Sequence, residues 1–358
     1  MNNVTDTVFA KKRHVKFLLR CLDILPAKYG SADSNKMTLA FFSISGLDML
    51  NSLSVIDDKK QDIINWVYAL QVLPGPSGNH YGRSGFQGSF ALGGKFKTNQ
   101  KTISDEEIPS YVCGHLAMTY TALSILIILG DDLAGVNYKA IIESLKSVQL
   151  DDGSFQPCVD GGENDMRFLY CACCISYILQ DWSGINIPRA VQYISLSQSY
   201  EGGFGQGPGL EAHGGSVFCS IASLYLMNEL DVLNEKQLNR LRQWCIMRQK
   251  SGFQGRPNKP EDSCYSFWIG ATLKLINANK FVNMNEIEKF MLSTQDSIIG
   301  GFSKWPDSSS DILHTYLSIV GLSLIDFPEI ATVHPALNFS ERAYGHLSYL
   351  HTKMKADN

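Results

Sequence analysis

The chain has 358 residues, of which 44% are hydrophobic and 18% charged, and its formal net charge at pH 7 is −4. A chain of this size can bury a large core, and nothing in its slightly acidic balance suggests nucleic acid or an anionic membrane as the main partner. The nine cysteines are an odd number, scattered without a disulfide framework, which is typical of a reducing compartment.

Neither the N-terminus nor the longest apolar run indicates a membrane protein. Charged residues interrupt the apolar residues near the N-terminus, and no small-residue cleavage site follows them, unlike in a secretory signal. The longest apolar run, residues 115–130, is too short for a membrane span and contains threonine and histidine. We therefore expect a cytoplasmic protein without a transmembrane segment and without a nucleic-acid partner.

An internal repeat organises the chain. The turn-like stretches DGSFQ, EGGFG, SGFQG and GGFSK repeat every 49 residues and place a phenylalanine at Phe155, Phe204, Phe253 and Phe302. A stretch charged on one side precedes each turn and ends in glutamine, at Gln149, Gln198, Gln249 and Gln295. A stretch with almost no charge follows each turn. The first kind predicts an outer amphipathic helix, and the second an inner helix that is buried on all sides.

In chain order, the first two inner helices are predicted over residues 38–50 and 115–129. Between them, SGFQGSF resembles an earlier turn, and an insertion in this second hairpin, at about 91–112, explains its wider spacing. The other inner helices are predicted over 167–179, 216–227, 264–273 and 312–324, and the outer helices before the four turns over 137–149, 186–198, 234–249 and 283–295. Six helical hairpins predict an all-α fold, an α/α toroid with a central cavity, which residues 1–358 form as a single domain.

Polar residues recur where the inner helices begin, although the helices themselves are apolar. Asp165, His213, Asp262 and His314 occupy similar places after successive repeat phenylalanines, and His115 does so once the insertion is removed. In a closed toroid, equivalent positions of successive repeats converge on one rim of the cavity. The sequence therefore predicts one shared site at this rim.

Three of these rim residues suit a metal ion. Asp262, Cys264 and His314 offer carboxylate oxygen, thiolate sulfur and imidazole nitrogen, a set suited to Zn²⁺ that leaves a fourth position open for substrate. Each also has an ordinary alternative: Asp262 as a helix N-cap, Cys264 as a packing thiol and His314 as a hydrogen-bonded core histidine. Their shared register favours the metal site.

Positive charge gathers around these three residues in an otherwise acidic protein. Arginine, lysine and a phenol are suited to bind a diphosphate as it leaves, and a helix that opens on glycines offers free N–H groups to an anion. The candidates are His213, Gly214, Gly215, Arg256, Lys259, Tyr265 and Lys304. A solvated loop face is the alternative for the group. Zinc, cations and apolar inner helices together predict a zinc-bound thiolate that attacks an allylic isoprenoid diphosphate.

The stretches EAHGG, GRPNKPEDSCYSFW and DILHTY resemble the β subunits of protein prenyltransferases, and the resemblance runs from about residue 15 to the end. It implies an α/α barrel that binds one Zn²⁺ and forms a heterodimer with a separate helical α subunit. It also implies that the zinc ligands are Asp262, Cys264 and His314, that the diphosphate is bound by His213, Arg256, Lys259 and Tyr265, and that Arg167 and Trp268 line the cavity.

Within that family, two differences favour the branch that transfers geranylgeranyl to C-a-a-X tails, named type I. Thr38 and Leu313 are smaller than the tryptophan and tyrosine that the resemblance implies for farnesyl-transferring members, which leaves room for a longer isoprenoid. Lys304 stands where those members hold Mg²⁺ with an aspartate, so we expect geranylgeranyl diphosphate as substrate and no requirement for magnesium.

The resemblance also implies how a peptide is bound. His115, Ala117 and Phe168 are expected to shape the pocket for the last residue of the tail, preferably leucine, in C-a-a-X proteins such as small GTPases. Leu317 departs from the aromatic residue of the family, which leaves the fine peptide preference open. Within the family, the alternative is a farnesyltransferase β subunit; outside it, the alternative is a non-catalytic α/α toroid scaffold.

Overall fold

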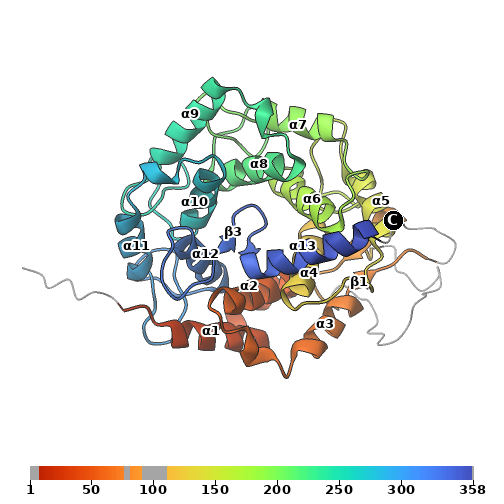
Figure 1. The fold of residues 1–358 in the computed structure, drawn as a ribbon, viewed down its shortest axis with the longest axis horizontal. Coiled ribbons are helices and arrows are strands. Elements are labelled where there is room, and N and C mark those ends of the chain that lie inside the picture. The colour runs from red at the N-terminus through yellow and green to blue at the C-terminus, as the bar shows by residue number, and fades with distance from the viewer. Residues whose placement is uncertain (1–7, 76–80, 91–110, 357–358) are drawn as a thin grey trace, which may run out of the picture.

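The computed structural model describes residues 8–75, 81–90 and 111–356, so the predicted insertion at about 91–112 falls almost wholly outside the described residues. Six described helices surround the centre in Figure 1. They are α2 (Lys36–Met49), α4 (Leu116–Ile128), α6 (Met166–Leu179), α8 (Gly214–Met227), α10 (Tyr265–Leu275) and α12 (Ile312–Ser323). Each packs against the next, and α12 packs against α2, so they close into a ring.

Amphipathic helices form the outside of this ring (Figure 1). They are α1 (Lys11–Asp23), α3 (Lys60–Ala69), α5 (Tyr138–Val148), α7 (Ile187–Leu196), α9 (Glu235–Ile246) and α11 (Met284–Ser293). Helix α4 is buried along nearly its whole length, whereas α9 buries only Leu241, Trp244 and Cys245. The predicted α/α toroid is therefore confirmed. Among the described residues, no helix is both long and apolar enough to cross a bilayer.

Short elements complete the described chain. The 3₁₀-helices are η1 (Ala27–Asn35), η2 (Leu53–Ile56), η3 (Tyr81–Arg83), η6 (Leu230–Val232) and η7 (Asn279–Phe281), and two antiparallel pairs join β1 (Gln71–Val72) to β2 (Gly85–Phe86) and β3 (Val333–His334) to β4 (Phe339–Ser340). The last element is α13 (Glu341–Ala356).

The repeated glutamine and phenylalanine form the same pair in every described repeat turn. Antiparallel bridges join Gln149 to Phe155, Gln198 to Phe204, Gln249 to Phe253 and Gln295 to Phe302, and Gln71 faces Phe86 in the β1–β2 pair. Each of these phenylalanine rings is at most 1% exposed. The repeat therefore marks a buried turn that fixes each outer helix against the inner helix that follows.

The glutamine side chains also join one hairpin to the next. The Gln149 amide accepts a hydrogen bond from the Asn186 N–H at 2.7 Å and donates to the carbonyl of the same residue at 3.2 Å, and Gln249 binds Asn283 in the same way. Gln295 makes this clamp with the start of the chain, accepting from the Ala10 N–H at 2.7 Å and donating to the Val8 carbonyl at 3.1 Å. The same pair of hydrogen bonds from a glutamine side chain to the backbone thus links neighbouring hairpins and closes the ring.

The C-terminal segment covers one end of the ring. The hydroxyls of Tyr120, Tyr170 and Tyr316 donate to the carbonyls of Leu337, Ala336 and Asn338, at 2.8, 2.9 and 2.5 Å. Arg342 donates to Asp48, near the end of α2, and to the carbonyl of Ile128, at the end of α4. Arg342, at the start of α13, therefore lies at the rim where α2 and α4 end, whereas residues 336–338 reach inside the ring to tyrosines in the first half of α4, α6 and α12. The opposite rim carries the first turns of the inner helices.

Candidate active site

The turn that leads into α10 and the first turn of α12 bring together the three side chains predicted to bind metal, called here the metal trio (Asp262, Cys264 and His314). One ligand atom from each lies within 4.8 Å of the other two. The Asp262 Oδ1 atom is 3.3 Å from the His314 Nε2 atom. Because α10 and α12 are neighbours in the ring, residues far apart in sequence meet at one point of the rim.

Local hydrogen bonds set the direction of each side chain in the metal trio. The Asp262 carboxylate accepts from the Cys264 N–H at 3.0 Å, which fixes the turn that leads into α10. Asp311 is the N-cap of α12: its Oδ1 atom accepts from the His314 N–H at 2.9 Å, and its Oδ2 atom lies 2.6 Å from His314 Nδ1. The other ring nitrogen, Nε2, is thereby turned toward Asp262.

The electrostatics of the metal trio favour a bound cation. Burial opposes the charged form of His314, but the Asp262 and Asp311 carboxylates outweigh it and raise the pKa of His314 to about 9. Burial, together with the neighbouring Asp262, raises the pKa of Cys264 well above its usual value. A buried thiol, imidazole and carboxylate in contact are all satisfied by a divalent cation, and this donor set fits zinc.

A pocket of about 240 Å³ adjoins the metal trio and shares Asp262 with it. All five side chains predicted to stabilise a departing diphosphate line this cation pocket, whose lining residues are His213, Gly255, Arg256, Lys259, Pro260, Asp262, Tyr265, Lys304 and Trp305. The Lys304 Nζ atom is 3.6 Å from Asp262 Oδ2, so it lies between the two parts of the site. The structure therefore places a positively charged pocket directly beside a possible metal site.

His213 and Tyr265 form a fixed pair inside the cation pocket. The Gly215 N–H donates to His213 Nδ1 at 3.1 Å, so a neutral His213 carries its proton on Nε2, which is 2.8 Å from the Tyr265 hydroxyl. Burial and the nearby Arg256 lower the pKa of His213, which keeps it neutral. The Tyr265 hydroxyl then accepts from histidine and keeps its own proton for an anion.

Glycine is required where Tyr265 crosses the pocket. A Cβ atom on Gly255 would lie 2.1 Å from the Tyr265 ring, and one on Gly214 would lie 2.9 Å from it. The Gly214 N–H also donates to the Gly255 carbonyl at 2.8 Å. The predicted Gly214 thus makes room for the tyrosine, in addition to starting α8.

Two lining contacts involve residues that the sequence reasoning did not select. Glu211 accepts from Arg256 at 2.7 Å, which holds the guanidinium at the edge of the cation pocket. The ammonium of Lys304 lies 4.7 Å from the centre of the Trp305 ring. Glu211 stands two residues before His213 in the quoted motif, but its contact with Arg256 crosses between repeats and has no local sequence signal.

The residues predicted to bind peptide gather at the start of α4 and α6. His115 is the N-cap of α4, where its Nδ1 atom accepts from the Ala117 N–H at 3.2 Å, and its ring lies 5.8 Å from that of Phe168. Arg167 lies 5.5 Å from the Phe168 ring and pairs with Asp165. These side chains form one cluster on the same rim as the cation pocket.

Thr38, Trp268 and Leu313 complete the predicted set. The Thr38 hydroxyl donates to the sulfur of Met118 at 3.4 Å, so it lies between α2 and α4. Trp268 packs against Phe218 with 5.3 Å between ring centres. Leu313, in the first turn of α12, is 38% exposed and is not part of the buried core.

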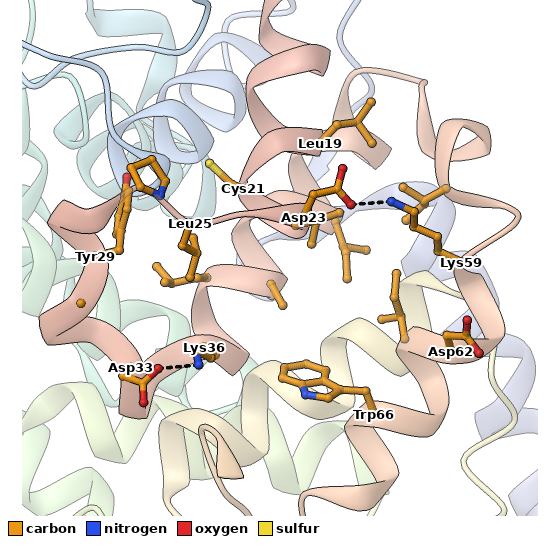
Figure 2. Close-up of a pocket in the computed structure, with 18 of the residues that line it drawn as sticks. Leu19, Cys21, Asp23, Leu25, Tyr29, Asp33, Lys36, Lys59, Asp62 and Trp66 are labelled. Atoms are coloured by element: carbon orange, nitrogen blue, oxygen red, sulfur yellow. Dashed lines mark hydrogen bonds and ion pairs between the residues drawn. The ribbon is translucent and has the colours of Figure 1, made fainter. Parts of the chain in front are cut away.

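A second pocket, of about 840 Å³, lies between α1, η1, α2 and α3, and none of the predicted site residues lines it (Figure 2). Its rim carries the ion pairs Asp23–Lys59 and Asp33–Lys36, and Trp66 forms part of its wall. Tyr29, another lining residue, accepts from the Ile312 N–H at 2.9 Å. The predicted metal-binding and cationic side chains therefore gather at the cation pocket, and the pocket between α1, η1, α2 and α3 contains none of them.

A closed α/α toroid with a possible metal site beside a cationic pocket is the arrangement that the resemblance to protein prenyltransferase β subunits implied. The family model for the prenyltransferase alpha-alpha toroid domain matches residues 9–339, and the chain belongs to this family. The resemblance drawn from the three motifs is thus confirmed.

Among the relatives compared, the chain shares more sequence with geranylgeranyl transferase type-1 β subunits than with a farnesyltransferase β subunit. It is 44% identical to the geranylgeranyl transferase type-1 subunit beta of Dictyostelium discoideum, over 94% of this chain and 96% of that protein. The corresponding Arabidopsis thaliana protein is 40% identical, over 92% and 88% of the two chains. A farnesyltransferase subunit beta from Schizosaccharomyces pombe is 29% identical, over 89% and 79%.

A solved structure shares the fold along nearly the whole chain. The Candida albicans protein geranylgeranyltransferase-I complexed with GGPP superposes with a TM-score of 0.84 at 29% sequence identity, covering 96% of this chain and 99% of that chain.

Proposed function

We propose that this chain is the catalytic β subunit of a zinc-dependent protein geranylgeranyltransferase of type I. It transfers geranylgeranyl from geranylgeranyl diphosphate to the cysteine of a C-terminal C-a-a-X sequence, preferably with leucine last. The observation that carries the proposal is the shared edge of the site, where Asp262 belongs both to the metal trio and to the cation pocket. A thiolate nucleophile at the metal trio and a diphosphate leaving group in the cation pocket would therefore lie side by side.

Asp262, Cys264 and His314 are proposed to hold one Zn²⁺ per β subunit. Held by these three side chains, zinc would supply the Lewis acidity that lowers the pKa of a substrate thiol and makes it a thiolate at neutral pH. Asp311 is proposed to orient His314 through the hydrogen bond to Nδ1, as carboxylates commonly do for metal-binding histidines.

The cation pocket is proposed to bind the diphosphate and stabilise it as the bond to the isoprenoid carbon breaks. Arg256, Lys259 and Lys304 supply positive charge. Tyr265, whose hydroxyl is held by a hydrogen bond with His213, donates a hydrogen bond to the diphosphate. Gly214 and Gly215 are proposed to shape the wall of the pocket at the start of α8 and not to supply free donors, because their N–H groups already donate to the Gly255 carbonyl and to His213 Nδ1. Removing one preorganised donor of this kind typically costs about 2.7 to 4 kcal/mol of transition-state stabilisation.

Substrate choice is proposed to rest on three positions. Thr38 and Leu313 leave space for the longer isoprenoid, and Lys304 provides in place of Mg²⁺ a fixed positive charge beside Asp262. The greater identity to type-1 subunits than to the farnesyltransferase subunit supports this assignment over a farnesyl-transferring enzyme.

The other predicted residues are proposed to shape the lipid and peptide surfaces. His115, Ala117 and Phe168 are proposed to contact the last residue of the tail, and Arg167 and Trp268 to line the cavity. A separate prenyltransferase α subunit is the proposed partner in a heterodimer, C-a-a-X proteins such as small GTPases are the proposed substrates, and the cytoplasm is the proposed location. Residues 1–358 are proposed to form one domain.

Zinc content tests the proposal most simply. The purified complex with an α subunit should contain one zinc per β subunit, and Cys264→Ser should lose it together with prenyl transfer. Cys245→Ser is the matched control, because Cys245 is fully buried in α9 and should keep both. A wild-type complex that binds no zinc and transfers no lipid would instead support a non-catalytic scaffold.

A further inference from the structure

Trp305 lines the cation pocket, yet the proposed transfer reaction gives it no role. Its side chain is 43% exposed, so packing in the core does not explain it. It directly follows Lys304, whose Nζ atom lies 4.7 Å from the centre of its ring, within the range of a cation–π contact. A large aromatic ring thus lies against the cation that is proposed to act in place of Mg²⁺.

The backbone that carries Lys304 and Trp305 is tied to the turn of the metal trio. Ser263, the residue before Cys264, donates from its N–H to the Lys304 carbonyl at 2.9 Å and from its hydroxyl to the Ser303 carbonyl at 2.7 Å. The Ser303 hydroxyl in turn donates to the Trp305 carbonyl at 2.7 Å. Both serines are buried. The backbone of Lys304 therefore has a set position beside the proposed zinc site.

The Lys304 side chain needs a further restraint, because four methylenes separate its ammonium from this fixed backbone. Its Nζ atom is 3.6 Å from Asp262 Oδ2, which is close enough for an ion pair but too far for a hydrogen bond. The indole face attracts the ammonium without a carboxylate that would neutralise it. The N–H groups of Lys304 can therefore still donate to an anion.

Other side chains of the cation pocket are also held by a neighbour. Glu211 accepts from Arg256 at 2.7 Å, and His213 lies 2.8 Å from the Tyr265 hydroxyl. Trp305 supplies the corresponding restraint for Lys304.

We propose that Trp305 is a positioning residue, whose indole face holds the Lys304 ammonium in the cation pocket where the diphosphate departs. Without the ring, the flexible lysine can close on Asp262 in a charge-assisted hydrogen bond of about 2.7 to 2.9 Å, which draws its charge away from the diphosphate. The inference deepens the proposed function and rests on it for the identity of the anion.

The test is a double-mutant cycle on the full complex with an α subunit, with inorganic pyrophosphate as the probe and calorimetry at fixed ionic strength as the measurement. Trp305→Leu should weaken pyrophosphate binding by about 2-fold to 30-fold, the range expected for losing a cation–π contact. Trp305→Phe, which keeps an aromatic face, should lose less. In the Lys304→Met background, Trp305→Leu should cause no further loss, because the cation is already absent.

Kinetics and a matched contact complete the test. The single-turnover rate of prenyl transfer should fall in Trp305→Leu by a similar factor, whereas the KM for the peptide should stay unchanged, since Lys304 acts on the diphosphate. Phe281→Leu is the control. The Lys280 ammonium lies 5.1 Å from the Phe281 ring, but this pair is in η7 and does not line the cation pocket, so neither quantity should change.

Two results would overturn the proposal. One is unchanged pyrophosphate binding in Trp305→Leu, and the other is an equal loss with and without Lys304, which would mean that the indole acts on the anion or on the partner subunit directly. If Trp305→Leu does not assemble, Trp305→Phe takes its place in the cycle, with a smaller loss that must again vanish in Lys304→Met. A coupled loss of pyrophosphate binding in a complex that transfers no prenyl group would uphold the positioning role and refute the proposed function. Prenyl transfer without that coupling would do the reverse.

Discussion

The contact between Asp311 and His314 can be separated into two contributions. Asp311 caps α12 through one oxygen and orients the His314 ring through the other, at 2.6 Å. Asparagine is as good an N-cap as aspartate, so Asp311→Asn keeps the cap, but its amide nitrogen, a donor, replaces the oxygen that faces His314 Nδ1 and removes both the charge and the acceptor behind the ring. Asp311→Ala removes these and the cap.

The expected magnitudes follow from these contacts. Losing a carboxylate behind a metal-binding histidine typically weakens metal binding by about 10-fold to 100-fold, or roughly 1.4 to 2.7 kcal/mol. We expect both variants to lose zinc affinity within this range, and Asp311→Ala alone to lose about 1 kcal/mol more of the free energy of unfolding from the missing cap.

Zinc affinity is measured by competition with a chromophoric chelator, on the complex with an α subunit. Because Asp311 also helps to keep a proton on His314, whose pKa is about 9, the variants are compared at neutral pH and again near pH 9. Glu211→Gln is the control, since Glu211 contacts Arg256 and should leave zinc affinity unchanged. Wild-type zinc affinity in Asp311→Ala at both pH values would refute the reasoning.

Three further predictions concern the ring and the cation pocket. Gln295→Ala should lower the free energy of unfolding, measured in urea, by about 2 kcal/mol, because two backbone groups lose their partner. Gln198→Ala is the control and should lower it less, because Gln198 makes no such bonds to the backbone of the next outer helix. Equal losses in the two variants would contradict the clamp. Burial lowers the pKa of His14 from 6.5 to about 4, so the unfolded chain binds a proton that the folded chain does not. Stability should therefore fall as the pH drops through this range, by up to about 3 kcal/mol, and His14→Gln should flatten that part of a melting-temperature profile; an unchanged slope would count against it. Lys304→Asp should make prenyl transfer depend on Mg²⁺, and a variant whose rate ignores added Mg²⁺ would sink that role.

The ring could be predicted because its repeat is explicit in the sequence. A constant spacing of Phe155, Phe204, Phe253 and Phe302 and the alternation of amphipathic with wholly apolar stretches are local signals that survive folding. The observed helices begin and end within a few residues of the predicted ranges. What the sequence did not reveal is that Gln149, Gln249 and Gln295 bind backbone groups of the neighbouring hairpin, because that contact lies between repeats.

The C-terminal segment was missed for a related reason. Residues after α12 follow no repeat, and the segment is held by tyrosine hydroxyls from three inner helices, each far away in sequence. The possible metal site could be predicted from the sequence because its residues occupy similar positions after successive repeat phenylalanines. Asp311 had a local signal, three residues before His314 at a helix start, whereas the Glu211–Arg256 contact had none.

The most direct test of the central proposal is the initial rate of prenyl transfer by the chain co-expressed with a prenyltransferase α subunit, with zinc present and magnesium absent. Two reactions are compared: geranylgeranyl to a Cys-a-a-Leu peptide and farnesyl to a Cys-a-a-Ser peptide. We predict a clear preference for the first reaction without magnesium. A farnesyl preference, or an absolute need for magnesium, would contradict the roles given to Thr38 and Lys304.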